Sequence, residues 1–466
     1  MIKLISPISF VLVLSLAISS QISAQVTDPS SRTLSEAQAY FDKGQANLNA
    51  GQYKEAVQAY EQGIRLNPKN ASAYANLGYA YSELGKPTED LDATKKALQI
   101  EPNDPYANAR ICFAYSKLNQ YEDAIRACKQ ANLFNPRSAE SFANLGYAYD
   151  HLKRHTEAVE AFKKSIEINP QNADTFNKLG WSYLQMGQYE DSIKALKQSI
   201  QLDPNYMTAY NNLGDAFFRL GRHAEAAETF KQAILMKPEE FWPHMNLGRT
   251  YFALEQYKKS IEELREAIRI DPKFAGAYVG LGLAYIKGAK YEEAIEAFSQ
   301  LIRLKPQEAN AFRSRSFVHL YLAHGDAAAA DAQKYLELSG GGNKSDLYMV
   351  LAAHLGYRQV GRDADAGRVL EEATIKANAM PWPYPVVRYL RDEITAEELL
   401  TQATGGDQKT EAQAYIGMDL SLAGKHVEAL VYLQWVKENG NKNFVEYSLA
   451  LSEIKRIEAM KEPTQP

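Results

Sequence analysis

The sequence predicts an all-α solenoid of two-helix repeats, and three regularities carry this prediction. Proline recurs every 34 residues over most of the chain, at positions 68, 102, 136, 170, 204, 238, 272 and 306. Glycine keeps the same spacing at 44, 78, 146, 180, 214, 248 and 282, with Cys112 filling the position between 78 and 146. Within each period, apolar residues fall three and four positions apart in two blocks, which indicates two amphipathic helices. A fixed period of this kind is the signature of a repeat architecture.

The recurring positions have a physical role in packing the two helices. Glycine on the first helix and a small residue twelve positions later let the backbones approach closely, as expected for Gly146 and Ala158. A larger side chain at either position would overpack the crossing, at a cost of about 1–3 kcal/mol. An aromatic residue or leucine four positions further on, such as Phe162, fills the space beside it. The proline ends the second helix because it lacks an amide donor and disfavours helical geometry in the preceding residue.

These residues also carry a family resemblance. The run Asn144-Leu145-Gly146-x-x-Tyr149, followed by Ala158, Phe162 and Pro170, resembles the tetratricopeptide repeat (TPR), and the resemblance covers about residues 37–340. It implies a TPR α-solenoid, a right-handed superhelix of helix-turn-helix repeats. We expect eight 34-residue repeats in 37–308 and degenerate repeats in 309–380. In the second repeat Asp90 and Thr94 replace the small and aromatic residues, which we interpret as a tolerated weak repeat, with partner contact as the alternative.

The C-terminal third departs from the regular pattern. The prolines at 381, 383 and 385 predict an extended crossing, so 381–409 is expected to be an extended segment and a short helix. One more repeat is predicted at 410–443 from Tyr415, Gly417, Gly424, Ala429 and Leu433. A capping helix is predicted at 444–460, and a disordered tail at 461–466.

This region has a second resemblance. The residues that carry it are Trp382, Val387-x-Tyr389-Leu390, Ile394-Thr395, Glu411, Tyr415-x-Gly417 and Asn443-Phe444-Val445-Glu446-Tyr447. They resemble the end of bacterial NlpI-type TPR lipoproteins, which are envelope adaptors that dock peptidoglycan hydrolases and a periplasmic protease. The chain departs from those proteins in its many clear repeats and in lacking the lipid-bearing cysteine. The resemblance therefore favours an adaptor role in the envelope without implying the same partners.

The first residues predict export. Lys3 is the only charge before Asp28, an apolar stretch runs through residues 8–18, and Ala24 offers a small residue for cleavage. We expect a signal peptide at 1–24 and a polar linker at 25–36, so the mature chain would be periplasmic or secreted. The alternative is an uncleaved anchor helix. The net charge of −5 gives no indication of a nucleic-acid partner, which would need concentrated Lys and Arg.

No catalytic motif, cofactor or metal is expected. The sequence has no glycine-rich phosphate loop, no nucleophile elbow and no His-Glu-x-x-His run. His151 and His155 lie four positions apart near Glu157, but His155 occupies the turn-side position that is tyrosine in other repeats, so we interpret it as structural.

The two cysteines take special positions in one repeat. Cys112 stands at the glycine position and Cys128 at the aromatic position, on opposing helices. In an exported protein this placement predicts a disulfide, the alternative being two buried free thiols.

In TPR arrays the first helices line the concave surface, and one outward position per repeat holds Asn76, Arg110, Asn144, Lys178, Asn212 and Asn246. Three residues further along are Tyr79, Phe113, Tyr147 and Trp181. Amides can bind the backbone of an extended peptide, and aromatic rings offer contact area at small entropic cost. We therefore predict partner binding there, the alternative for each residue being a solvated surface or core role.

The expected function is an exported, non-enzymatic scaffold that binds a protein or peptide in its concave groove, in envelope assembly or remodelling. One alternative is an accessory subunit of a polysaccharide-export or peptidoglycan-remodelling complex that contacts glycan. A second alternative is an enzyme site hidden in residues 340–466, although that segment is short and repeat-like for a catalytic domain. The identity of the partner and the existence of a homodimer are left open.

Overall fold

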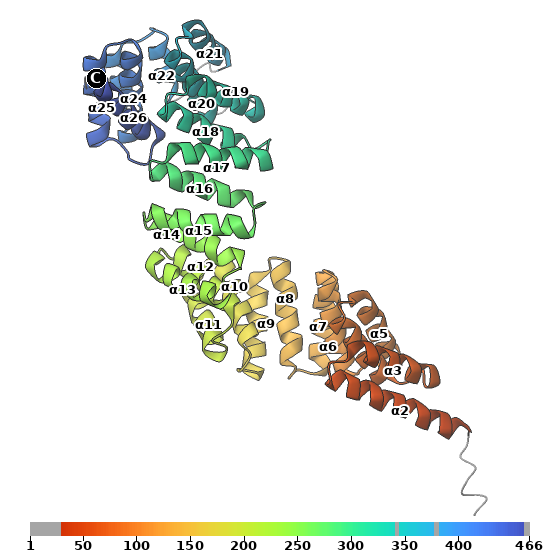
Figure 1. Ribbon diagram of the computed structural model, residues 1–466. Coiled ribbons are helices and arrows are strands. Elements are labelled where there is room, and N and C mark those ends of the chain that lie inside the picture. Colours follow the sequence, from red (N-terminus) through yellow and green to blue (C-terminus); the bar gives the residue numbers. More distant parts are fainter. Residues whose placement is uncertain (1–28, 341–343, 377–381, 461–466) are drawn as a thin grey trace, which may run out of the picture. The chain divides into compact units, whose positions relative to one another are not determined.

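The computed structural model describes residues 29–340, 344–376 and 382–460 (Figure 1). The described residues are arranged as successive α-helices joined by short turns, and they divide into two compact units, Met1–Leu220 and Gly221–Pro466. We call these unit 1 and unit 2. The predicted signal peptide at 1–24 and the predicted tail at 461–466 lie outside the described residues.

The described part of unit 1 consists of consecutive helix pairs and ends on the first helix of a further pair. Each second helix packs against the first helix of its own pair and against the first helix of the next pair. The helices are α2 (Pro29–Asn49), α3 (Tyr53–Leu66), α4 (Ala71–Glu83), α5 (Pro87–Ile100), α6 (Pro105–Lys117), α7 (Tyr121–Phe134), α8 (Ala139–His151), α9 (His155–Ile168), α10 (Ala173–Gln185), α11 (Tyr189–Leu202) and α12 (Met207–Arg219).

Unit 2 begins with the same arrangement and then changes. The repeating helices are α13 (His223–Met236), α14 (Phe241–Ala253), α15 (Tyr257–Ile270), α16 (Ala275–Lys287), α17 (Tyr291–Leu304), α18 (Ala309–Tyr321), α19 (Gly325–Ser339), α20 (Lys344–Gln359) and α21 (Asp363–Lys376). The remaining helices are α22 (Tyr384–Leu390), α23 (Ala396–Gln402), α24 (Gly406–Leu422), α25 (His426–Asn439) and α26 (Val445–Ala459). The predicted fold class, an all-α solenoid of two-helix repeats, is confirmed.

The turn inside each repeat needs one residue in the left-handed region. In four of the first six repeats this residue is glycine, as at Gly51 with φ 71° and Gly187 with φ 74°. Non-glycine residues occupy the same turn elsewhere, including Lys153 with φ 60° and Ala289 with φ 54°. A side chain with a Cβ pays a steric cost there that glycine avoids. The repeat geometry therefore overrides local preference at those turns.

The glycine of the first helix is in close contact with the second helix, as the sequence predicts. A Cβ at Gly146 would lie 2.7 Å from the Phe162 ring, and one at Gly180 would lie 2.5 Å from Leu196. The small residue is close as well, because Ser192 Oγ donates a 2.7 Å hydrogen bond to the Gly180 carbonyl. The side chain sixteen positions after each glycine thus packs directly over it, rather than beside the crossing.

Two boundaries differ from the sequence prediction. Residues 25–36 were expected to be a linker, yet α2 begins at Pro29. The extended crossing predicted for 381–385 is also wrong within the described residues, because α22 begins at Tyr384 and includes Pro385 in its first turn. Proline is accepted in the first turn because its missing amide would have no helical partner there.

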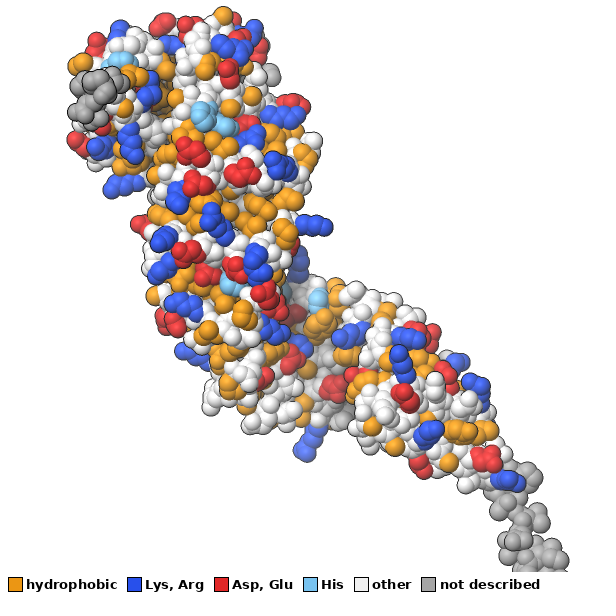
Figure 2. Space-filling view, viewed as in Figure 1, with side chains coloured by type: hydrophobic (Ala, Val, Ile, Leu, Met, Phe, Trp, Pro, Cys, Tyr) orange, Lys and Arg blue, Asp and Glu red, His pale blue; other side chains and the backbone are white. Residues whose placement is uncertain are grey.

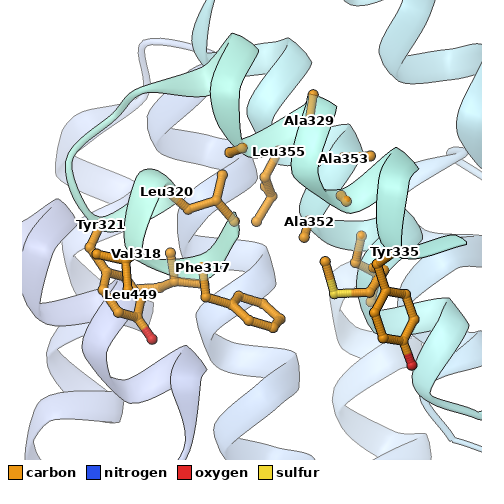
Figure 3. Packing of buried hydrophobic residues seen from close by; sticks show 14 of the residues in the cluster. Phe317, Val318, Leu320, Tyr321, Ala329, Tyr335, Ala352, Ala353, Leu355 and Leu449 are labelled. Atoms are coloured by element: carbon orange, nitrogen blue, oxygen red, sulfur yellow. The ribbon is translucent and has the colours of Figure 1, made fainter. Parts of the chain in front are cut away.

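The C-terminal helices pack back onto an earlier repeat. Helix α26 contacts α24 and α25, as a capping helix would, and it also contacts α18. Figure 3 shows Leu449 of α26 beside Tyr321 and Val318 of α18, and all three belong to one buried cluster. The end of the chain therefore stabilises unit 2 by covering one side of α18.

Within residues 29–340, 344–376 and 382–460, no helix combines the length and the hydropathy that crossing a bilayer requires.

Candidate partner-binding surface

The first helices of the unit 1 repeats form one continuous side of that unit. Helices α4, α6, α8, α10 and α12 contact one another in sequence, in addition to contacting their second helices. We call this side the first-helix face. Since the turns and the first-helix glycines are held in the same geometry in each repeat, equivalent residues recur on this face once per repeat.

The predicted aromatic residues lie on this face, one per repeat. Tyr79, Phe113 and Tyr147 are half-buried, and the Trp181 side chain is 42% exposed. The Tyr147 ring lies 4.3 Å from the ring of His151, measured between centroids. Burial raises the pKa of the Tyr147 hydroxyl, so this side chain presents a neutral ring and hydroxyl at physiological pH.

Each of these aromatic side chains is followed, 31 residues later, by a polar side chain of the next first helix. The Arg110 guanidinium lies 5.2 Å from the centre of the Tyr79 ring, and Lys178 Nζ lies 5.4 Å from the centre of the Tyr147 ring. Both distances fall in the range of cation–π attraction. By the same spacing, Asn144 follows Phe113 and Asn212 follows Trp181.

Arg110 belongs to the fold rather than to a partner surface, which corrects the sequence prediction. Its side chain is buried, and its Nε and Nη2 atoms donate to the two Asp90 oxygens at 3.0 and 2.6 Å. Arg110 Nη2 also donates to the Gly78 carbonyl at 3.3 Å. A bidentate pair of this kind satisfies a carboxylate that would otherwise be buried alone. The unusual Asp90 of the second repeat is therefore explained by the arginine of the third.

Asn212 is also buried and used within the chain. Its Nδ2 donates a 2.9 Å hydrogen bond to Asn177 Oδ1 on the preceding first helix. Asn177 Nδ2 in turn lies 3.4 Å from the Tyr206 hydroxyl. These three side chains join the repeats of α10 and α12, so the assignment of Asn212 to partner contact is not supported by its position.

The remaining predicted residues differ in their availability. Lys178 Nζ pairs with Asp174 Oδ2 at 2.6 Å, and Asn76 Nδ2 donates to Gln45 Oε1 at 3.2 Å. Asn144 Nδ2 is buried without a hydrogen-bond partner in the described structure. Asn246 is half-buried and lies in unit 2. The candidate surface of unit 1 is therefore centred on Tyr147 and Trp181, because the amide nitrogen of Asn144 is buried.

Two residues that the sequence did not point to as partner-binding also lie on this face. Lys117 Nζ is 5.0 Å from the centre of the Phe113 ring, and the His151 ring stacks on Tyr121 with a centroid distance of 4.5 Å. Lys117 follows Phe113, and His151 follows Tyr147, by four positions on the same helix. Residues at that spacing lie on one helix face, which is the signal that could have identified them.

Cys112 and Cys128 face each other across α6 and α7. Their Cα atoms are 4.9 Å apart and the two sulfur atoms are joined in the structure. Both residues are completely buried. They occupy the positions of Gly146 and Phe162 in the next repeat, where the second side chain lies over the first backbone. The same geometry brings the two sulfur atoms together.

Charges on the surface are of mixed sign. In Figure 2, acidic and basic side chains alternate over the visible face, with hydrophobic side chains between them. Binding by such a surface depends on local pairing and on ring contact rather than on a long-range field of one sign.

Comparisons with known families agree with this geometry. A family model for the TPR repeat matches residues 248–288, and a second tetratricopeptide-repeat model matches residues 275–308. The chain is a tetratricopeptide-repeat protein. A model for the C-terminal domain of cilia and flagella-associated protein 70, a TPR domain, matches residues 14–241. Among curated proteins, none matches this chain.

Several solved TPR structures are similar to parts of the chain. A TPR protein from Parabacteroides merdae is 19% identical, with 53% of this chain and 98% of that chain covered and a TM-score of 0.43. PilF of Pseudomonas aeruginosa is also 19% identical, covering 44% of this chain and 94% of its own, with a TM-score of 0.40. YrrB, described as a TPR protein with an unusual peptide-binding site, is 24% identical over 40% of this chain and 96% of its own, with a TM-score of 0.36.

Proposed function

We propose that this TPR protein is an exported adaptor of the cell envelope, which binds an extended segment of a partner protein on the first-helix face of unit 1. TPR repeats form protein-interaction scaffolds, and the scaffold is generally non-catalytic. The observation that carries the proposal is the row of aromatic side chains from Tyr79 to Trp181, one in each successive repeat.

The spacing of these groups fits an extended chain. Successive first helices contact one another, so the aromatic side chains recur at the separation of neighbouring helices, about 8–10 Å. An extended peptide places side chains of one face at roughly 7 Å intervals, which is close to this repeat.

The exported and envelope parts of the proposal rest on the sequence. They depend on the signal-like residues 1–24, on the cysteine pair, which suits an oxidising compartment, and on the NlpI-type resemblance of the C-terminal third. Fractionation of cells that express the full chain tests this part directly. Retention of the whole chain in the cytoplasm, with residues 1–24 still attached, would contradict it.

The binding part is tested by capture from the native envelope. The full chain carries a C-terminal tag, is crosslinked in its own cells, and is compared with a Tyr147→Ala/Trp181→Ala double variant. Asn212 is left unchanged because its hydrogen bond to Asn177 supports the fold. Leu133→Ala is the matched control, because Leu133 lies on the second helix α7 and is 77% exposed.

We expect the parent and the Leu133 control to retain the same protein, and the double variant to lose it while keeping its helicity and melting temperature. Capture that is equal in all three chains would overturn the assignment to this face. A direct peptide measurement then follows, in which the crosslinked segment is synthesised and titrated against parent and variant. Truncating the half-buried Tyr147 and the exposed Trp181 should weaken binding by roughly tenfold or more.

A glycan ligand is the second candidate, because the exposed ring of Trp181 also suits stacking against a sugar. Binding to a glycan array that the double variant loses, without capture of any protein, would favour this candidate over the peptide.

A further inference from the structure

Two histidines face each other across the turn between α18 and α19. His319 lies in the last turn of α18, and His324 is the N-terminal capping residue of α19. Their Nδ1 atoms are 3.4 Å apart, and their ring centroids are 5.6 Å apart. One ring nitrogen of each histidine is therefore directed toward the other histidine.

The equivalent side chains of other repeats meet in the same way, although their chemistry differs. In the repeats of α4–α5 and α8–α9 the two positions hold a cation over a tyrosine ring, at 5.8 and 4.7 Å from the ring centre. His319 stands at the repeat position of Tyr149, and His324 stands at that of Arg154. The turn thus brings these two positions together in several repeats, and among the repeats of the 34-residue period only this one has histidine at both.

The separation of the two nitrogens fits two ligands of one metal ion. Imidazole nitrogens bind Zn²⁺ at about 2.0–2.1 Å, which places two of them about 3.3–3.4 Å apart at the tetrahedral angle. A direct hydrogen bond explains the pair less well, because 3.4 Å exceeds the usual range of about 2.7–3.2 Å for an N–H donor.

His319 has the surroundings of a metal ligand. Its Nε2 lies 3.9 Å from Asp331 Oδ2, so the carboxylate favours the tautomer that is protonated on Nε2 and leaves the Nδ1 lone pair to a metal. Arg315 donates to both oxygens of Asp331 at 2.7 Å, which fixes the carboxylate and balances the charge of the guanidinium. Burial lowers the pKa of His319, so its imidazole is neutral at physiological pH, the form that binds metals.

The core of unit 2 holds one side of the pair, and the other side is exposed. Leu320 and Tyr321, which follow His319, are buried in the cluster shown in Figure 3. Gln359 Nε2 also donates to the Leu320 carbonyl at 3.2 Å. His324 is exposed. A metal ion can therefore approach from the side of His324 while α18 stays packed.

We propose that His319 and His324 bind one divalent transition-metal ion of the Zn²⁺ type through their Nδ1 atoms. Among the residues that the structure describes, no group of three or more His, Cys, Asp or Glu side chains is placed to hold a metal ion, so water completes the coordination. Imidazole ligands favour Zn²⁺, Ni²⁺ and Cu²⁺ over Mg²⁺ and Ca²⁺, which prefer oxygen. The site does not depend on the peptide-binding proposal, because both histidines lie in unit 2.

Calorimetric titration of the full chain with Zn²⁺ tests the proposal, with protein purified without a histidine tag. The main variant is His319→Tyr/His324→Arg. It introduces the residue types that Tyr149 and Arg154 supply at the same positions, so we expect the fold to be kept. Each single variant is measured in the same way, and circular dichroism and thermal melting check that all of them are folded.

His426→Tyr is the matched control. His426 begins the second helix α25, as Tyr53 begins α3. The substitution removes one imidazole from unit 2 and leaves the pair intact. Titration with Mg²⁺ in parallel measures the weak binding that surface carboxylates alone provide.

We expect the parent and the His426→Tyr control to bind one Zn²⁺ per chain. Each single variant should bind Zn²⁺ about tenfold or more weakly, because the ion loses one of its two protein ligands. The double variant should bind Zn²⁺ no better than Mg²⁺. Electron paramagnetic resonance of the Cu²⁺ complex should show coupling to two imidazole nitrogens in the parent and to one in each single variant.

Zn²⁺ binding that is unchanged in the double variant would overturn the proposal, as would no Zn²⁺ binding by the parent beyond that of Mg²⁺. Loss of binding with only one of the two single substitutions would also overturn it, because the two histidines would then not share an ion. None of these results bears on the Tyr147→Ala/Trp181→Ala experiment, so the two assignments can fail independently.

Discussion

Asp90 and Arg110 form a buried ion pair that joins two consecutive repeats of unit 1, with Arg110 Nη2 2.6 Å from Asp90 Oδ2. Asp90 occupies a position that is a small residue in other repeats, and Thr94 Oγ1 lies 3.1 Å from its Oδ1. Burial raises the pKa of the Asp90 carboxyl in spite of the neighbouring guanidinium. Two side chains that look irregular in their own repeats are thus explained by each other.

Removing one member of this pair should be costly. Arg110→Ala would leave a buried carboxylate without its partner, and we expect a loss of about 3–5 kcal/mol in the free energy of unfolding. Replacing the whole group with the residues of neighbouring repeats, as Asp90→Ala/Thr94→Phe/Arg110→Asn, should restore most of that stability. Urea denaturation of the parent, the single variant and the triple variant measures the difference. A single variant as stable as the parent would show that the pair contributes nothing.

The positive-φ turns offer a stabilising change. Ala289 adopts φ 54° where other repeats have glycine. Ala289→Gly should raise stability by roughly 0.5–1 kcal/mol, because the relief of left-handed strain exceeds the added freedom of the unfolded chain. The reverse change Gly187→Ala, at φ 74°, is the matched control and should lower it. Thermal midpoints of both variants decide the matter, and a lower midpoint for Ala289→Gly would contradict the strain argument.

Glu446 should make the stability of unit 2 fall as the pH rises through the neutral range. Burial, with a smaller contribution from the nearby Glu411 carboxylate, raises the pKa of Glu446 to about 8. The Tyr415 hydroxyl donates to Glu446 Oε1 at 3.4 Å, and Glu411 accepts from Trp382 Nε1 at 2.6 Å. The Tyr348 hydroxyl of α20 donates to Glu411 Oε2 at 3.0 Å. Burial, with a contribution from the charge of Glu446, raises the pKa of Tyr348 and of Tyr321 on α18.

The sign of the pH effect follows from proton binding. The unfolded carboxyl has a pKa of about 4.3, so between that value and about 8 the folded state holds the proton more tightly than the unfolded state does. The contribution of Glu446 is therefore complete at acidic pH and is lost as the pH rises to about 8. Glu446→Gln should flatten the fall in melting temperature between pH 5 and pH 8, roughly the interval between the two pKa values. Glu458→Gln, at an exposed position of the same helix, should leave the profile unchanged.

The cysteine pair predicts a redox-dependent stability. Intact mass spectrometry of protein purified from its own cells without reductant should show the chain lacking two thiol hydrogens. Reduction should lower the free energy of unfolding by about 3 kcal/mol, because the bridge closes a loop of 16 residues in the unfolded chain. A Cys112→Ala/Cys128→Ala variant should not respond to reductant. Free-thiol masses at both positions would end the disulfide assignment.

Much of the repeat architecture could be read from periodic residues. Gly146, Phe162 and Pro170 each have a role that depends on near neighbours in the same repeat, so their spacing alone predicts two packed helices and where they end. The aromatic row on the first helices could be predicted for the same reason. The role of Arg110 could not, because the carboxylate that it binds is twenty residues away in another repeat. Asn212 was wrongly assigned to partner contact for the same reason, because its hydrogen-bond partner Asn177 lies on a different first helix.

The sequence by itself therefore determined the class of fold and the register of every regular repeat, since a 34-residue period repeats the same local contacts. Only the tertiary structure decided which residues on that framework are available to a partner. Equivalent positions such as Leu283 and Phe317 have the same local sequence role, yet one is exposed and the other is covered. One physical reason is that α18 is also packed by α26, more than a hundred residues later in the chain, and a periodic pattern does not encode contacts at that range.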